Sequence, residues 1–281
     1  MQFLNNIFTA LRNPKMAIAF ARWISSRIFG GSPRVHFRKL DGQISAASVG
    51  GWISFSEYWT FSDLVPESEE TLCLNSLARS KSGGLAMDVG ANLGVFTCRI
   101  ASLGYSVHAF EPIPETFERL RLNVEFNGLT PHVHLNRSAV GAAAGMVSFE
   151  KLENSPAQNR IAITGGEGTT EVPVICLDDY ARDQNIEFID FLKIDVEGME
   201  TGVIRGASRL LSEHLIATIL IEVCPWNLLN AGTSPEELFC VIGESGYEPH
   251  RLFGTGEIGG VVTADEFGEI IFENLVLLPK Q

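Results

Sequence analysis

The sequence predicts an α/β fold, and two observations on its 281 residues support this. First, apolar runs of strand length at residues 85–89, 133–135, 191–194 and 216–223 alternate with segments of helical periodicity. Second, 45% of the residues are hydrophobic, which is enough to fill one full core. We therefore expect one main α/β domain preceded by an N-terminal helical arm.

The first strand runs into a glycine turn that is typical of a nucleotide-type cofactor site. The turn reads Asp88-Val89-Gly90-Ala91-Asn92-Leu93-Gly94, and residues 95–103 then form the predicted helix. Glycines let the backbone approach a ligand, and the helix directs free N–H groups toward it. Glu111 lies 23 residues beyond Asp88, at the end of the second strand, where it can accept ribose hydroxyls. The expected cofactor residues are Asp88, Gly90, Ala91, Asn92, Gly94, Glu111 and Pro112.

The turn favours S-adenosylmethionine over NAD. A dinucleotide site has a second glycine that makes room for the pyrophosphate, whereas this chain has Asn92 there. An acid at the position of Asp88 repels a pyrophosphate but suits the cationic amino group of a methionine moiety. An NAD-linked oxidoreductase remains the alternative enzyme. A helix over residues 116–126 and the third strand then lead to Ser138 and Ala139, which we expect to flank the adenine.

A second group of polar residues follows the later strands. Residues 146–151 and 172–177 have the pattern of an added pair of strands, and the apolar strand after them delivers Lys193 and Asp195 to its carboxyl end. Glu197 begins the turn into a helix around residues 201–211. The strand over residues 216–223 brings Glu222 to the same carboxyl edge of the sheet as Asp195. Buried strands rarely carry charges without a partner or a function.

These charged residues allow three interpretations. We expect Asp195, Glu197, Glu222 and Lys193 to be catalytic, with Asp195 also beside the cofactor. A purely structural ion pair between Lys193 and Glu222 is the bland alternative. Three acids at one edge also suit Mg²⁺ or Mn²⁺, but acids around a cationic cofactor need no metal, and we assign no metal ligands.

Charge is distributed unevenly along the chain. Residues 1–40 contain seven basic and no acidic residues, so the net charge of −13 leaves −20 for the remainder. An acidic body disfavours nucleic acid as a partner. The five cysteines are scattered, odd in number and without C-x-x-C spacing, which favours a reducing cytoplasm over a disulfide scaffold. No segment has the pattern of a signal peptide or of a membrane span.

The basic arm, residues 1–40, is predicted to contain two amphipathic helices on either side of Pro14. Packing on the domain or homodimerisation is the favoured role, and peripheral contact with the inner face of an anionic membrane is the alternative. Residues 41–65 are an aromatic-rich connecting or lid segment, and residues 66–281 form the cofactor-binding domain.

The chain resembles the FkbM family of S-adenosylmethionine-dependent methyltransferases over residues 66–278. The resemblance rests on the glycine turn, Phe110-Glu111-Pro112, Cys176-Leu177-Asp178-Asp179, Phe191-Leu192-Lys193-Ile194-Asp195-Val196-Glu197-Gly198-Met199-Glu200 and Val203-Ile204-Arg205-Gly206-Ala207. It implies a Rossmann-like, seven-stranded, mostly parallel sheet of class I methyltransferases. It also implies O-methylation of a hydroxyl on a sugar or glycan, a polyketide or another secondary metabolite. A non-catalytic scaffold that docks on a membrane or partner through the arm is the alternative from another class.

Overall fold

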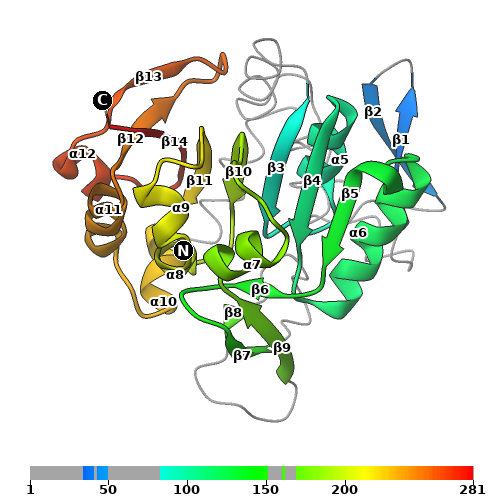
Figure 1. Cartoon of the computed structure of the whole chain (residues 1–281), viewed down its shortest axis with the longest axis horizontal. Helices are drawn as coiled ribbons and strands as arrows, with labels where there is room; N and C mark the ends of the chain where they lie inside the picture. The colour runs from blue at the N-terminus through cyan, green and yellow to red at the C-terminus, as the bar shows by residue number, and fades with distance from the viewer. Residues whose placement is uncertain (1–33, 41–42, 50–82, 151–159, 162–168, 281) are drawn as a thin grey trace, which may run out of the picture.

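A large twisted sheet with helices on both faces organises the molecule (Figure 1). The computed structural model describes residues 34–40, 43–49, 83–150, 160–161 and 169–280. The first parallel strand is β3 (Gly84–Val89), and the strand order across the sheet is β13-β12-β14-β11-β10-β3-β4-β5. This is the predicted α/β class with a Rossmann-like arrangement.

The sheet has eight strands where seven were expected, because β13 pairs with the outer edge of β12. Five neighbouring strands, from β11 to β5, run parallel, whereas β14 is antiparallel to both β11 and β12. The strands after β3 are β4 (Tyr105–Phe110), β5 (Val133–Asn136), β10 (Phe191–Ile194), β11 (Ile219–Val223), β12 (Tyr247–Leu252), β13 (Ile258–Val261) and β14 (Glu273–Pro279).

Alternating side chains along the strands separate two apolar cores. Ala86, Val107 and Ala109 pack toward α5 (Val95–Ser102) and α6 (Pro114–Phe126). The other face, with Met87 and Ile194, packs toward the later helices. These are α7 (Leu177–Asp183), α8 (Glu200–Gly206), α9 (Ser208–Ser212), α10 (Pro225–Asn230), α11 (Pro235–Glu244) and α12 (Ala264–Gly268), and a short 3-10 helix, η1 (Thr130–His132), precedes β5. A sheet covered in this way leaves its carboxyl edge for ligands.

A second, four-stranded sheet projects from the end of the molecule where β5 finishes (Figure 1). Its order is β6-β9-β7-β8, and the antiparallel pairing of β7 with β9 confirms the added pair of strands. The strands are β6 (Ala139–Val140), β7 (Gly145–Glu150), β8 (Arg160–Ile161) and β9 (Thr169–Ile175).

The prediction of one helix around residues 201–211 is wrong in one respect. The segment forms two helices, α8 and α9, that are separated at Ala207. The Asp178 carboxylate accepts hydrogen bonds from the backbone N–H groups of Arg209, at 2.8 Å, and Leu210, at 3.0 Å. A side chain from α7 therefore caps the start of α9. The strand expected over residues 216–223 is also shorter, with Ile216 in an isolated bridge to Ile189.

The two helices expected in the basic arm, the aromatic segment from residue 50 onward and the helix expected after it lie outside the described residues. Within residues 34–49, β1 (Arg34–Leu40) and β2 (Gln43–Val49) pair as an antiparallel hairpin. No helix in the described ranges is long and apolar enough to span a bilayer.

Candidate functional site

The glycine turn after β3 is held against the end of β4. The backbone N–H groups of Gly90 and Ala91 both donate to the carbonyl oxygen of Phe110, at 3.1 and 2.9 Å. Gly90, Asn92 and Gly94 all have positive φ, at 83°, 50° and 87°. Glycine adopts this backbone conformation easily and asparagine tolerates it, so the turn is built from residues that suit it.

Gly90 has a second role that the sequence did not reveal. A Cβ at this position would lie 1.7 Å from the backbone carbonyl oxygen of Asp195, and the N–H of Asp195 donates to the carbonyl of Val89 at 3.0 Å. The missing side chain therefore lets the turn after β3 lie directly against the end of β10. The two motifs that were predicted separately meet through their backbones.

Asp88 is fully buried at the end of β3. One carboxylate oxygen, Oδ2, accepts a hydrogen bond from Thr97 Oγ1 at 2.6 Å, while Oδ1 has no partner among the described residues. Burial raises the pKa of Asp88, and the charge of Lys193 opposes that rise. An ionised Asp88 therefore needs a cation beside it, which fits the predicted contact with a cationic amino group.

Glu111 is buried where the second crossover begins. Its Oε2 accepts from the backbone N–H of Asn92 at 3.0 Å, and its Oε1 accepts from that of Ile113 at 2.9 Å. These bonds fix the carboxylate and leave further lone pairs for hydroxyl donors. Burial raises the pKa of Glu111 to about 7, and the two backbone bonds oppose that rise. The sequence-predicted ribose acceptor is therefore fixed at the same sheet edge as the glycine turn.

The remaining expected cofactor residues lie near this edge. Pro112 and Ala139 are half-buried and Ser138 is buried. Ala139 begins β6 and pairs with Val174 of β9, so it belongs to the second sheet. Ser138 thus lies at the junction between the end of β5 and the second sheet.

At the end of β10, Lys193 forms an ion pair with Asp195, with Nζ and Oδ2 2.8 Å apart. The ammonium group also lies 4.8 Å from the centroid of the Phe96 ring. The bland alternative pairs Lys193 with Glu222; the ion pair with Asp195 joins Lys193 to the residue just after β10, and the charge of Lys193 also lowers the pKa of Glu222. The side chain of Lys193 is 9% exposed and that of Asp195 is 31% exposed, so the carboxylate is the accessible member.

Glu197 follows in a strained turn, with φ at 53°. Its Oε2 accepts a hydrogen bond from Asn227 Nδ2 of α10 at 2.6 Å. A Cβ on Gly198 would lie 2.3 Å from the carbonyl oxygen of Asn227, so glycine is needed for α10 to approach. Burial and the charge of Asp195 raise the pKa of Glu197 to about 7. Asn227 thus orients Glu197 from a distant part of the chain.

Two more acids complete the cluster. Burial raises the pKa of Glu222 well above its ordinary range, and the charges of Asp195 and Glu197 raise it further. Buried Glu200 accepts from the N–H groups of Gly198, at 3.1 Å, and Val196, at 3.3 Å, and its pKa is raised by burial to about 7. Glu200 Oε2 has no partner among the described residues. Several acids thus surround one lysine.

The structure brings the four predicted catalytic residues together, since the charges of Lys193 and Asp195 both act on the pKa values of Glu197 and Glu222. Sequence reasoning missed Thr97, Glu200 and Asn227. Glu200 is the last residue of the motif that begins at Phe191, and its place in the first turn of a helix was the only available signal. Asn227 had none. Among the described residues, no three His, Cys, Asp or Glu side chains are arranged to hold a metal ion.

Comparison with known proteins decides the family. Residues 88–249 match the model of the methyltransferase FkbM domain, which is more than half of the chain. The chain belongs to the FkbM family of S-adenosylmethionine-dependent methyltransferases. Membership favours the methyl donor over NAD and places every predicted site residue within the matched segment.

The chain is also similar to two curated methyltransferases and to one solved structure. The hexuronic acid methyltransferase AglP of Haloferax volcanii is 29% identical over 193 residues, covering 68% of this chain and 74% of AglP. The 31-O-demethyl-FK506 methyltransferase FkbM of Streptomyces tacrolimicus is 28% identical over 158 residues, covering 45% of this chain and 60% of that protein. A crystal structure of a SAM-dependent methyltransferase from Agrobacterium tumefaciens aligns with 90% of this chain and 72% of its own, at 7% identity and a TM-score of 0.44.

Some residues of the FkbM motifs are structural in this chain. Asp178 caps α9, and Cys176 Sγ lies 2.9 Å from the carbonyl oxygen of Gly206. A Cβ on Gly206 would lie 2.0 Å from the carbonyl oxygen of Gly141, so this glycine lets α8 pack against the start of the second sheet. These residues position α8 and α9 and take no part in the acid cluster.

Proposed function

We propose that this FkbM methyltransferase transfers the methyl group of S-adenosylmethionine to a hydroxyl oxygen of a sugar or glycan, a polyketide or another secondary metabolite. The observation that supports this most is the convergence of Asp195, Glu197 and Glu222 around Lys193 at the carboxyl edge of the sheet. The relatives support it too, since one is a hexuronic acid methyltransferase and another is named for a 31-O position.

The residues around the glycine turn fit the donor. Fully buried Asp88 has an unpartnered oxygen, and fixed Glu111 retains acceptor capacity for ribose hydroxyls. We assign the methionine amino group to Asp88, the ribose to Glu111, the glycine turn and Pro112 to the adenosyl side, and the adenine to Ser138 and Ala139. When bound, S-adenosylmethionine supplies an electrophilic methyl carbon on a sulfonium.

The acid cluster then orients the acceptor and removes its proton. An alcohol is a weak nucleophile until a base takes its proton, and a positioned base contributes about 10²–10⁴-fold. We assign this role to Glu222, because burial, and after it the charges of Asp195 and Glu197, raise its pKa and make its carboxylate strongly basic. Glu197, held by Asn227, orients the acceptor, and Asp195 faces the reacting methyl group. Lys193 is a positioning residue, since its charge favours the ionised acids.

The proposed methyl transfer is balanced in atoms and charge. The C–O bond forms as the C–S bond breaks, S-adenosylhomocysteine leaves as the neutral thioether, and the hydroxyl proton goes to the Glu222 carboxylate. No other reactant is needed. We expect no requirement for a divalent metal, so activity should survive EDTA.

A transfer assay with radiolabelled S-adenosylmethionine tests the proposal. Methyl glycosides of glucuronic acid and glucose, together with a hydroxylated macrolide, serve as acceptors, and mass spectrometry locates the new methyl group on oxygen. Transfer to oxygen that persists with EDTA supports the proposal. Transfer only to nitrogen or carbon, or none to any hydroxylated acceptor despite donor binding, contradicts it.

A further inference from the structure

Helix α10 is attached to the acid cluster through its first turn. It starts two residues after β11, with Pro225 at its first position. Asn227 holds Glu197 through its side chain and packs on Gly198 through its backbone. Leu228, fully buried, anchors the helix in the core. The first turn of α10 is thus fixed relative to the proposed base and orienting acid.

The outward face of this fixed helix is apolar. Trp226 is 72% exposed and Leu229 is 60% exposed, and residues three apart lie on one face of a helix. Single exposed apolar side chains are common and need no explanation. A largely exposed tryptophan next to Asn227, on a helix bound to the acid cluster, is less ordinary, because aromatic residues of this kind are enriched where proteins contact ligands.

Two more exposed apolar residues lie just before the strand next to β11. Ile271 and Phe272 are 87% and 60% exposed and immediately precede β14. In the register of the sheet, Val223 at the end of β11 pairs with Glu273. Ile271 and Phe272 therefore lie beyond the same edge of the sheet as Glu222 and α10.

We infer that Trp226 is a specificity-determining residue that stacks its indole on the ring of a carbohydrate acceptor whose hydroxyl enters the acid cluster. This inference rests on the proposed O-methylation and narrows its acceptor class. The C–H faces of a pyranose ring are apolar and match an indole, while its hydroxyls suit Glu197 and Glu222.

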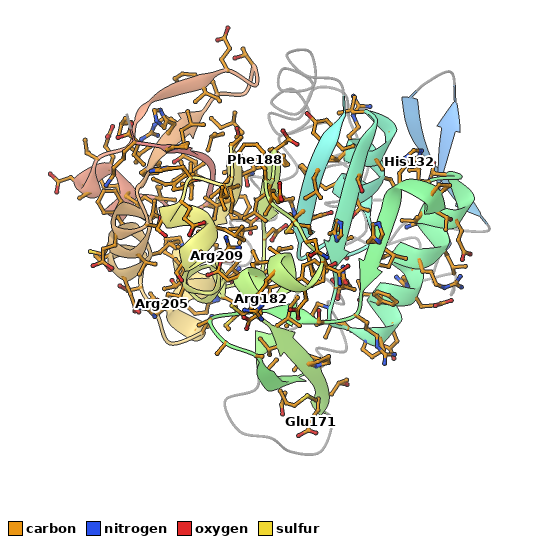
Figure 2. All side chains as sticks on the ribbon, in the orientation of Figure 1. His132, Glu171, Arg182, Phe188, Arg205 and Arg209 are labelled. Carbon is orange, nitrogen blue, oxygen red and sulfur yellow. The ribbon has the colours of Figure 1, made fainter. Side chains whose placement is uncertain are left out.

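Kinetics of three variants test the assignment, with methyl β-D-glucuronide and methyl β-D-glucoside as probes. We expect Trp226→Ala to raise the KM for the accepted glycoside about tenfold, with a small change in kcat, because one stacking contact is lost. Trp226→Phe should keep most of the affinity. Phe188→Ala is the control, since this exposed aromatic precedes β10 at the opposite edge of the sheet (Figure 2) and should have no effect.

Two further measurements separate the possible failures. Calorimetric affinity for S-adenosylmethionine should be the same in Trp226→Ala and the wild type, showing an intact donor site. The glycoside should change the tryptophan fluorescence of the wild type more than that of Trp226→Phe. If the wild type methylates a glycoside and Trp226→Ala has the same KM, the inference fails and the proposed function stands. If the wild type methylates only non-carbohydrate hydroxyls, the inference also fails. If it methylates no hydroxyl at all, both fail.

Discussion

A Cβ added to Gly90 would lie 1.7 Å from the backbone carbonyl oxygen of Asp195, so the glycine turn and the end of β10 are in direct backbone contact. Donor-side and acceptor-side residues are therefore fixed relative to one another without any side chain between them. Since a misplacement of about 1 Å can slow a positioned reaction about a hundredfold, this contact matters for the chemistry as well as the fold.

Gly90→Ala should destabilise the fold by about 3 kcal/mol or more, because it adds both a positive-φ penalty and a collision with backbone. Gly104→Ala is a matched control, since Gly104 has φ at 93° and nothing within 4 Å of an added Cβ. Its penalty should be only about 1–2 kcal/mol. Urea denaturation compares the two variants, and equal losses would show that the contact with Asp195 has no energetic role.

Lys193→Met should lower turnover at pH 7 at least about tenfold and move the pH–rate profile to higher pH. The charge of Lys193 lowers the pKa values of Glu197 and Glu222, so its removal lets both acids hold protons to higher pH. Lys193→Arg keeps the charge and should keep the profile. A lysine that only supported folding would lower the active fraction without moving the profile, and an unmoved profile contradicts the assignment.

Glu222→Gln should reduce kcat by about 10²–10⁴-fold while the affinity for S-adenosylmethionine changes little, because the variant removes the base and keeps the shape. Glu197→Gln should act mainly on the acceptor KM, since this acid is assigned to orientation. Steady-state kinetics and donor calorimetry on both variants distinguish these roles. Full turnover of Glu222→Gln would exclude it as the base.

Glu200→Gln should make the protein more stable at pH 8 by roughly 1–3 kcal/mol and leave stability at pH 5 nearly unchanged. Burial raises the pKa of Glu200 to about 7 from its ordinary 4.5. Between those values the unfolded chain has lost a proton that the folded chain retains, so the free energy of unfolding falls as pH rises through this window.

Chemical denaturation at pH 5, 6.5 and 8 measures this effect. Glutamine can still accept the N–H groups of Val196 and Gly198, so the loop conformation is kept. Glu257→Gln removes an exposed carboxylate and is the control for net charge. A Glu200→Gln profile parallel to that of the wild type would mean that the buried carboxylate does not titrate in this range.

Local sequence patterns were sufficient to predict much of this architecture. The turn after β3 and the strands carrying Asp88, Glu111 and Asp195 were predicted because apolar runs, glycines and acids occur within short segments. Lys193, Asp195, Glu197 and Glu222 were predicted, because charges at the ends of buried strands are rare and parallel strands end at one edge.

The remaining features depend on contacts between distant segments. Asn227 reaches Glu197 across 30 residues, and Asp178 caps α9 from 31 residues away, which also explains the break at Ala207. β13 was missed because its four residues, two of them glycine, lack the apolar pattern of a buried strand. No local pattern in the sequence indicates that Asn227 contacts Glu197 or that Asp178 caps α9.

We propose that the cluster of acids receives a cationic methyl donor, and binding calorimetry with two ligands tests this most directly. S-adenosylmethionine carries a sulfonium charge that S-adenosylhomocysteine lacks. As pH rises from 6 to 8, Glu111, Glu197 and Glu200 lose protons, so S-adenosylmethionine should bind progressively tighter while S-adenosylhomocysteine gains much less. Equal pH dependence for the two ligands would contradict the claim.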